Sequence, residues 1–195
     1  MSPTLLVGDY IVVSKMGYGS TGWLFGGGPA RGDVVVFKLP RDGAINYVER
    51  VIGLPGDEIV VRNAIVYIND AALSQTPAGD HVGSEELGRP KPRYEETLPN
   101  GVKHYVLHWA RQAEYDNVGP FHVPAGHYFM MGDNRDNSID SRVPPRYGVG
   151  YVPYDNLVGR VEVIYLSAAV NDPGAFRLTN PWTYIRWGRL GSRVR

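Results

Sequence analysis

Short β-prone segments recur along this chain and constrain its fold more than any other feature. Seven segments are rich in valine, isoleucine and tyrosine and are bounded by glycine, proline, asparagine or aspartate, as β-strands usually are. They read YIVVSK, DVVVF, NYVERVI, EIVVRNAIVYIND, VKHYVLHW, HYFMM and LVGRVEVIYL. No segment repeats apolar residues at helical spacing over three turns. The sequence therefore predicts a mainly β fold, and RNA at 62–64 is expected to turn a hairpin.

Composition limits the possible functions. With 195 residues, 43% of them hydrophobic, the chain can form one core with an inserted lobe. Twenty basic and twenty acidic residues cancel, so no net charge favours nucleic acid as a partner. The absence of cysteine excludes disulfides, thiolate metal sites and a cysteine nucleophile. No apolar run approaches the ~18 residues of a membrane-spanning helix, so the chain as it stands is expected to be soluble.

The five histidines are spread along the sequence without metal-binding spacing. Only His104 and His108 share a face of one expected strand, and that segment places no acidic ligand beside them. We therefore interpret both as solvated surface histidines. No metal and no cofactor is expected.

Changes in composition set two segments of the chain apart. Residues 74–100 are polar and rich in proline and glycine, and we interpret them as a long excursion between strands. Residues 173–195 form a tail rich in arginine and aromatic residues.

Two segments carry aromatic side chains that suit a lipid surface. Trp23, Leu24 and Phe25 lie at the tip of a glycine-rich loop, and the tail interleaves aromatic residues with five arginines and no acid. Aromatic side chains favour the headgroup boundary, and arginine attracts anionic lipid. The alternative is that the aromatic residues pack on the β core and the arginines form a solvated face. The sequence leaves both open.

The segment GDNRDNSIDSR at 132–142 is the most informative stretch. Three aspartates, two asparagines, two serines and two arginines surround a single isoleucine. Such side chains must bond one another and the backbone. An Asx-rich surface turn and a calcium loop are alternatives, but the acids do not follow EF-hand spacing. The alternation of aspartate and arginine instead predicts a network of pairs that fixes the loop.

Four blocks of the sequence resemble the type I signal peptidases, membrane-bound bacterial proteases that remove signal peptides from exported proteins. They stand in the family's order and read MSPTLLVGDYIVVSK, RGDVVVFKLP, YVERVIGLPGD and HYFMMGDNRDNSIDSR. The resemblance implies an antiparallel-sheet catalytic core at 1–58 and 126–172, with a variable inserted β lobe at 59–125 that contains the excursion. It also implies serine endopeptidase chemistry on signal peptides of exported preproteins, at the bacterial inner membrane with this domain facing the periplasm.

Family chemistry uses a serine nucleophile and a neutral, desolvated lysine as general base. By resemblance the serine would stand immediately before Met1, so it is absent from this sequence, and the lysine position is Glu49. Ser2 would lie ~6–7 Å along the strand from the nucleophile position and is not expected to replace it. A carboxylate with its ordinary pKa of about 4.3 is a far weaker base than a desolvated amine. The chain is therefore expected to be inactive.

The resemblance also implies a peptide site. The pocket for the residue before the cut would be lined by Met1, Leu5, Tyr47 and Val48, with Val36 near a second pocket. Small apolar pockets of this kind favour Ala-x-Ala ends.

Supporting residues surround the base position in the same comparison. Ser138 would contact Glu49, and two structural pairs are expected, Asp133 with Arg50 and Asp140 with Arg142. Strand alternation places Arg50 on the face opposite Glu49, so Arg50 should not neutralise it. Enclosure is therefore expected to raise the pKa of Glu49.

Three interpretations are left. The chain is a signal peptidase whose start was set at an internal methionine, which explains the missing serine but not Glu49. Alternatively it is an inactive homologue that binds signal-peptide-like segments or a membrane partner, which explains Glu49 and is compatible with the start. A self-cleaving repressor relative shares the Ser–Lys chemistry, but the GDNRDNSIDSR block and the absence of a DNA-binding helix pair argue against it.

Overall fold

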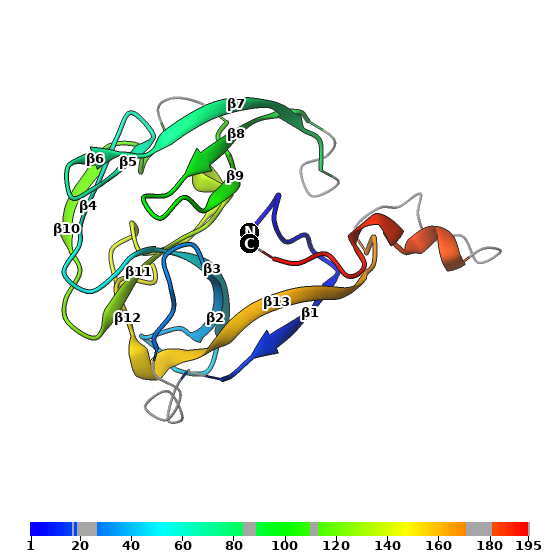
Figure 1. The fold of residues 1–195 in the computed structure, drawn as a ribbon, viewed down its shortest axis with the longest axis horizontal. Coiled ribbons are helices and arrows are strands. Elements are labelled where there is room, and N and C mark those ends of the chain that lie inside the picture. Colours follow the sequence, from blue (N-terminus) through cyan, green and yellow to red (C-terminus); the bar gives the residue numbers. More distant parts are fainter. Residues whose placement is uncertain (17, 19–26, 84–88, 110–112, 171–180, 195) are drawn as a thin grey trace.

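The computed structural model describes residues 1–16, 18, 27–83, 89–109, 113–170 and 181–194. Trp23, Leu24 and Phe25, proposed from the sequence as membrane-facing, lie outside these residues. The described chain is built from antiparallel β-sheets with a few short 3₁₀ helices, which confirms the mainly β prediction (Figure 1). None of the described helices is long and apolar enough to cross a membrane.

The largest sheet has six strands and contains the blocks that resemble the signal peptidases. Its strands lie in the order β1 (Asp9–Ser14), β13 (Leu157–Ser167), β2 (Val34–Lys38), β3 (Asn46–Gly53), β11 (His127–Met131) and β12 (Val152–Pro153). Apolar clusters lie on both faces of its central strands. Phe37 and Val51 belong to one cluster, whereas Ile52 and Phe129 belong to another.

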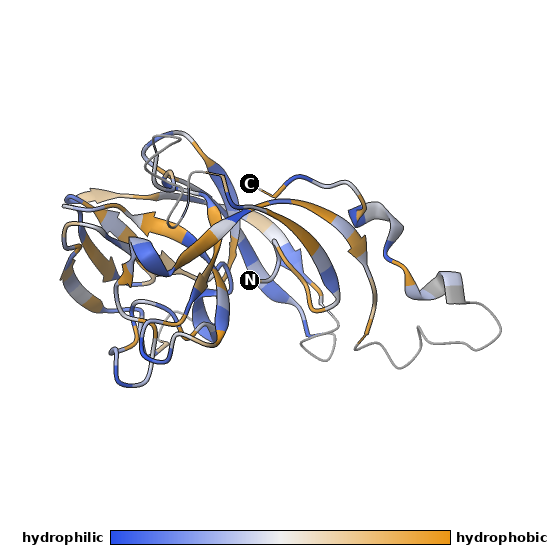
Figure 2. Ribbon diagram, turned by 90° about the horizontal axis from the view of Figure 1, so that it is seen from below, coloured by the Kyte–Doolittle hydropathy of each residue, from blue (hydrophilic) through white to orange (hydrophobic). Residues whose placement is uncertain are grey.

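Two smaller sheets contain every described strand between residues 58 and 122. One has the order β10 (Val118–His122), β4 (Glu58–Arg62), β5 (Ile65–Ile68) and β6 (Ala71–Ala72); the other has β7 (Ser74–His81), β8 (Lys91–Thr97) and β9 (Lys103–Leu107). Ile52 and Phe129 of the large sheet pack with Ile59 and Val66 of the four-stranded sheet. These two sheets therefore share apolar packing, and Figure 2 shows hydrophobic residues along the strands.

The expected hairpin at 62–64 is present, because β4 and β5 pair with Arg62 opposite Ile65. Its two turn residues, Asn63 and Ala64, both have left-handed φ values, 50° and 66°. Two positive φ values are what a two-residue hairpin turn requires, although alanine adopts them at a cost of ~1–2 kcal/mol. The Ala64 N–H donates to the Asp116 carbonyl oxygen at 3.1 Å, which holds the turn in place.

The interpretation of residues 74–100 as an excursion between strands was wrong. Most of this region forms β7 and β8, which pair with each other from Ser74 opposite Thr97 to His81 opposite Lys91. β8 also pairs with β9 along its length. The polar composition concealed the strands because most side chains of β7 are exposed or half-buried rather than alternating with core residues.

The C-terminal residues return along β13 (Figure 1). The Val194 N–H donates to the Glu162 carbonyl oxygen at 3.0 Å, and Arg193 forms a β-bridge with Val163. The 3₁₀ helices η5 (Pro181–Tyr184) and η6 (Trp187–Arg189) precede this segment. Trp182 and Trp187 in these helices stack on each other and are exposed.

Candidate functional site

Glu49 lies in the middle of β3, on the strand face that it shares with Tyr47 and Val51. It is opposite Val35 of β2, and the pairing of β3 with β11 begins one residue later, at Arg50. Its residue surface is only 7% exposed. The structure thus encloses this carboxyl group in the centre of the large sheet.

Among the residues that the structure describes, one hydroxyl group forms a hydrogen bond with the carboxyl group of Glu49. The Ser138 hydroxyl donates a hydrogen bond to Oε1 of Glu49 at 3.2 Å, which is the contact expected from the sequence. The second oxygen, Oε2, is buried and has no hydrogen-bond partner among the described residues. Burial, reinforced by the nearby negative charge of Asp140, raises the pKa of Glu49 to about 8. The carboxyl group therefore keeps its proton at neutral pH.

Gly132 permits this arrangement, and the sequence reasoning did not single it out. A Cβ atom at this position would lie 2.4 Å from Oγ of Ser138 and 2.9 Å from Oε2 of Glu49. Both distances are far shorter than van der Waals contact. A glycine directly after the buried strand HYFMM is therefore the sequence feature that could have predicted the close approach of Ser138 and Glu49 to this backbone.

Arg50 points to the other face of β3 and pairs with Asp133, as expected. Its Nε donates to Oδ1 of Asp133 at 2.8 Å and its Nη2 to Oδ2 at 2.7 Å, which makes the pair bidentate. Thr4 also donates to Asp133, and Arg50 donates to the Gly32 carbonyl oxygen. Burial opposes ionisation of Asp133, but the Arg50 charge outweighs it and lowers the pKa below its usual value.

Asp140 and Arg142 form the second expected pair, directly beside Glu49. Nε of Arg142 donates to Oδ1 of Asp140 at 3.0 Å and Nη2 to Oδ2 at 2.8 Å. Asp140 also accepts a hydrogen bond from the Gly132 N–H at 3.1 Å. This pair therefore fixes the strand end that carries Gly132 against the loop that carries Ser138.

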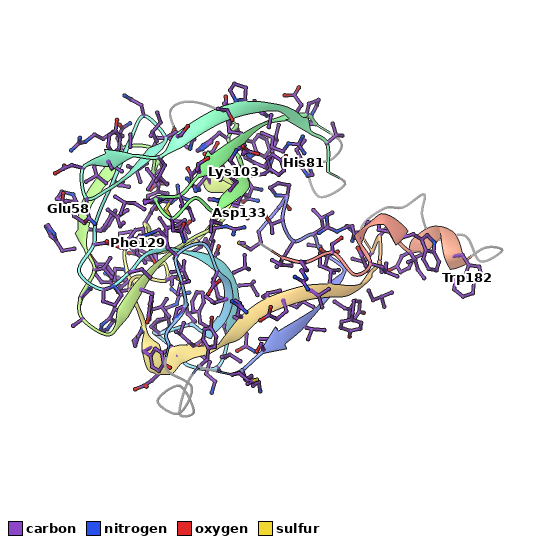
Figure 3. The ribbon with its side chains drawn as sticks, in the orientation of Figure 1. Glu58, His81, Lys103, Phe129, Asp133 and Trp182 are labelled. Carbon is purple, nitrogen blue, oxygen red and sulfur yellow. The ribbon has the colours of Figure 1, made fainter. Side chains whose placement is uncertain are left out.

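A third pair extends the network into the lobe and was not foreseen. Arg135 binds Glu96 of β8 through two donors, and the Arg135 charge keeps the pKa of Glu96 well below its usual range despite complete burial. His104 of β9 lies beside this pair, with Nε2 3.3 Å from Oε1 of Glu96. Asp133 lies nearby, beside β9 in Figure 3.

The interpretation of His104 and His108 as solvated surface residues was therefore wrong. Both are buried. Acidic residues from other elements lie next to them: Glu96 beside His104, and Asp136 beside His108. Their burial results from pairing between distant strands, which the local sequence does not display.

The three pairs leave Glu49 without an arginine partner, and the positive charge of the Met1 α-amino group lowers the pKa of Glu49 but does not outweigh burial. Among the described residues, the buried arginines Arg50, Arg135 and Arg142 each bind one carboxylate, and none donates a hydrogen bond to Glu49. An isolated buried carboxylate is strongly disfavoured, so protonation is the expected response. The predicted network of pairs that fixes the loop is present. Its arginines bind other carboxylates and leave Glu49 unpaired with them.

Four of the five residues proposed for peptide binding lie in one apolar cluster. Met1, Leu5 and Val48 pack against Val36, together with Val34 and Val161. Tyr47 lies on the opposite face of β3, where its ring packs near Phe37 with 6.1 Å between ring centroids. The sequence did not anticipate that Val194 of the C-terminal segment also packs against this cluster.

Comparisons with known proteins give one consistent family. The model of the family described as signal peptidase, peptidase S26, matches residues 1–166. Signal peptidases I from Rickettsia typhi and Rickettsia canadensis are each 36% identical to this chain, over 93% of its length and 77% of theirs. This chain belongs to the signal peptidase I family. A solved signal peptidase I from Enterococcus faecalis aligns with 28% identity over 69% of this chain and 97% of its own, at a TM-score of 0.40.

Membership of the signal peptidase I family excludes the repressor interpretation.

One edge of β3 is open beside Glu49. Asn46 to Glu49 pair with β2 on one side, whereas β11 pairs with β3 only from Arg50 to Gly53. No described strand pairs with the other edge of residues 46–49. Residues 46–49 therefore present unpaired backbone groups beside Glu49 and next to the apolar cluster, as a strand edge that binds an extended segment does.

Proposed function

We propose that this protein binds signal-peptide-like segments through the signal peptidase fold but does not hydrolyse them by Ser–Lys chemistry. The observation that carries this proposal is Glu49, a buried acid that stands where the family pattern has its lysine base. Its hydrogen bond from Ser138, the absence of an arginine partner among the described residues and its raised pKa all support a protonated side chain at this position.

The chemistry follows from the protonation state. A general base must accept a proton from the attacking hydroxyl at working pH. With a pKa of about 8, Glu49 is already protonated at pH 7 and cannot accept a second proton as a base. Only above pH 8 does its ionised form predominate, so any turnover that depends on Glu49 should be confined to alkaline solution.

Peptide binding is supported by the open strand edge and the cluster beside it. An extended peptide that pairs with residues 46–49 places alternate side chains toward the Val36–Val48 cluster. The cluster consists of closely packed valine, leucine, isoleucine and methionine side chains, so small apolar residues fit it better than large ones. Ala-x-Ala segments are the proposed ligands for this reason.

A membrane location at the periplasmic face is part of the same proposal. The exposed Trp182–Trp187 stack supports contact with a lipid headgroup layer. The arginines contribute less than their number implies. Arg189 pairs with Asp9, and Arg186 donates to backbone carbonyl oxygens of Val7 and Ala168.

The test is peptide binding measured by fluorescence anisotropy on the full chain. A labelled peptide that ends in Ala-x-Ala should bind, and the same peptide with phenylalanine in place of the final alanine should bind at least tenfold more weakly. Val36→Phe, which fills the cluster, should have a similar effect. Val12→Phe, at an exposed position of β1, is the control. Equal affinity for both peptides, together with no effect of Val36→Phe, would refute the proposed site.

A further inference from the structure

A group of three metal-ligand residues lies outside the site described above. His108 follows β9, Asp116 precedes β10 and Asp136 lies in the 3₁₀ helix η3 (Arg135–Asn137). One donor atom from each lies within 4.8 Å of the others. We propose that the His108–Asp116–Asp136 cluster binds a divalent transition-metal ion.

His108 is the observation that points to a ligand rather than to a simple acidic cluster. It is 7% exposed, and both of its ring nitrogens are buried without a hydrogen-bond partner among the described residues. A buried imidazole with neither nitrogen satisfied loses the hydrogen bonds that water would give it. The Tyr94 ring packs against the imidazole edge-to-face, with 5.9 Å between centroids, and fixes its orientation.

The spacing within the cluster fits a bound ion. Nδ1 of His108 lies 3.4 Å from Oδ1 of Asp136, which is longer than a good N–H···O hydrogen bond of ~2.7–3.2 Å. Two ligands that each bind a tetrahedral zinc ion at about 2.0–2.1 Å stand about 3.3 Å apart. The His108–Asp136 pair therefore needs almost no movement to share an ion, and Asp116 needs a modest one.

Both carboxylates are held by the backbone in a way that is typical of metal sites. Oδ2 of Asp116 accepts a hydrogen bond from the Ala113 N–H at 2.8 Å, and Oδ2 of Asp136 accepts one from the Trp109 N–H. Such outer contacts orient ligand carboxylates. The two arginines of the same loop, Arg135 and Arg142, bind Glu96 and Asp140 through their side chains.

The donor set defines the class of ion. One imidazole nitrogen and two carboxylate oxygens suit Zn²⁺, Mn²⁺ or Co²⁺ better than the all-oxygen preference of Ca²⁺ or Mg²⁺. Such an ion would join the lobe, through His108 and Asp116, to the loop on which Ser138 follows Asp136 by two residues. Its role would be to hold the Ser138 loop against the lobe.

The experiment is calorimetric titration of the full chain, stripped with a chelator, with ZnCl₂. One equivalent should bind saturably and raise the unfolding temperature. His108→Ala should weaken binding at least tenfold. His122→Ala is the matched control, because His122 also lies beside a carboxylate, at 3.5 Å from Glu58, yet its side chain is 73% exposed.

Absence of saturable binding, or affinity that survives both His108→Ala and Asp116→Asn, would overturn the proposal. Loss of affinity in His122→Ala instead would place the ion at the surface and also overturn it. If the His108→Ala protein does not fold, the wild-type protein loaded with Co²⁺ provides the test of the site. Pulsed electron paramagnetic resonance should detect one coordinated imidazole nitrogen, still present after His122→Ala, and no imidazole signal would refute the site.

Discussion

Replacing Glu49 with glutamine should make the stability of the protein less dependent on pH. In the unfolded chain this carboxyl group ionises near its ordinary pKa of 4.5, whereas in the folded state it ionises only near 8. Between these values the unfolded state binds fewer protons, so the wild type loses stability as pH rises. Glutamine has the same shape and does not titrate, so the Glu49→Gln protein lacks this loss.

The magnitude follows from the size of the pKa shift. Each pKa unit corresponds to about 1.4 kcal/mol, so between pH 4.5 and pH 7 the wild type should lose about 3 kcal/mol relative to Glu49→Gln. Stability from the protonated group is fully present below pH 4.5 and is lost as pH climbs toward 8. Other buried carboxyl groups titrate in both proteins and cancel in the difference.

The assay is urea unfolding of both proteins at half-unit steps from pH 4.5 to pH 8.5, with the denaturant slope checked for constancy. Glu114→Gln is the control, because Glu114 is exposed and its replacement should give a flat difference. A flat difference for Glu49→Gln would mean that Glu49 is solvated or paired with a cation. A difference that favours the wild type at high pH would refute its enclosure outright.

Three further substitutions test the surroundings of Glu49. Gly132→Ala should destabilise the protein by ~1–3 kcal/mol in urea unfolding, because its Cβ would overlap Ser138, whereas Gly188→Ala, with open space around it, should change stability by less than ~0.5 kcal/mol. Arg142→Met should cost ~3–5 kcal/mol by leaving Asp140 charged and buried, while the exposed Arg160→Met should cost under ~1 kcal/mol; equal costs would contradict the buried pair. Val194→Ala should raise the affinity for an Ala-x-Ala peptide about two- to fivefold by clearing part of the apolar cluster, and unchanged affinity in anisotropy would show that Val194 does not compete with the peptide.

The strands could be predicted from the sequence because their signal is local. Alternating valine and isoleucine identify β2, β3 and β13, and the RNA turn identifies the β4–β5 hairpin. The contacts of Ser138 with Glu49, and the Arg50–Asp133 and Arg142–Asp140 pairs, followed from motifs shared with a known family. The structure contains all three.

What could not be predicted depends on contacts between distant segments. Arg135 meets Glu96 and His108 meets Asp136 only because the three-stranded sheet folds against the GDNRDNSIDSR loop. Val194 reaches the Val36 cluster because the C-terminal segment returns along β13. Local patterns of polarity do not indicate such pairings. For this reason the buried His104 and His108 were interpreted as surface residues, and β7 and β8 as an excursion between strands.

Cleavage of a preprotein substrate, followed by mass spectrometry at pH 7, tests the central claim most directly. The substrate should remain intact with the wild type and with Glu49→Gln. Glu49→Lys, in a chain that carries a serine directly before Met1, should give a product cut after Ala-x-Ala, because both members of the family's catalytic pair are then present. Wild-type cleavage at that junction that is lost in Glu49→Gln would contradict the account, because Glu49 would then be a working base.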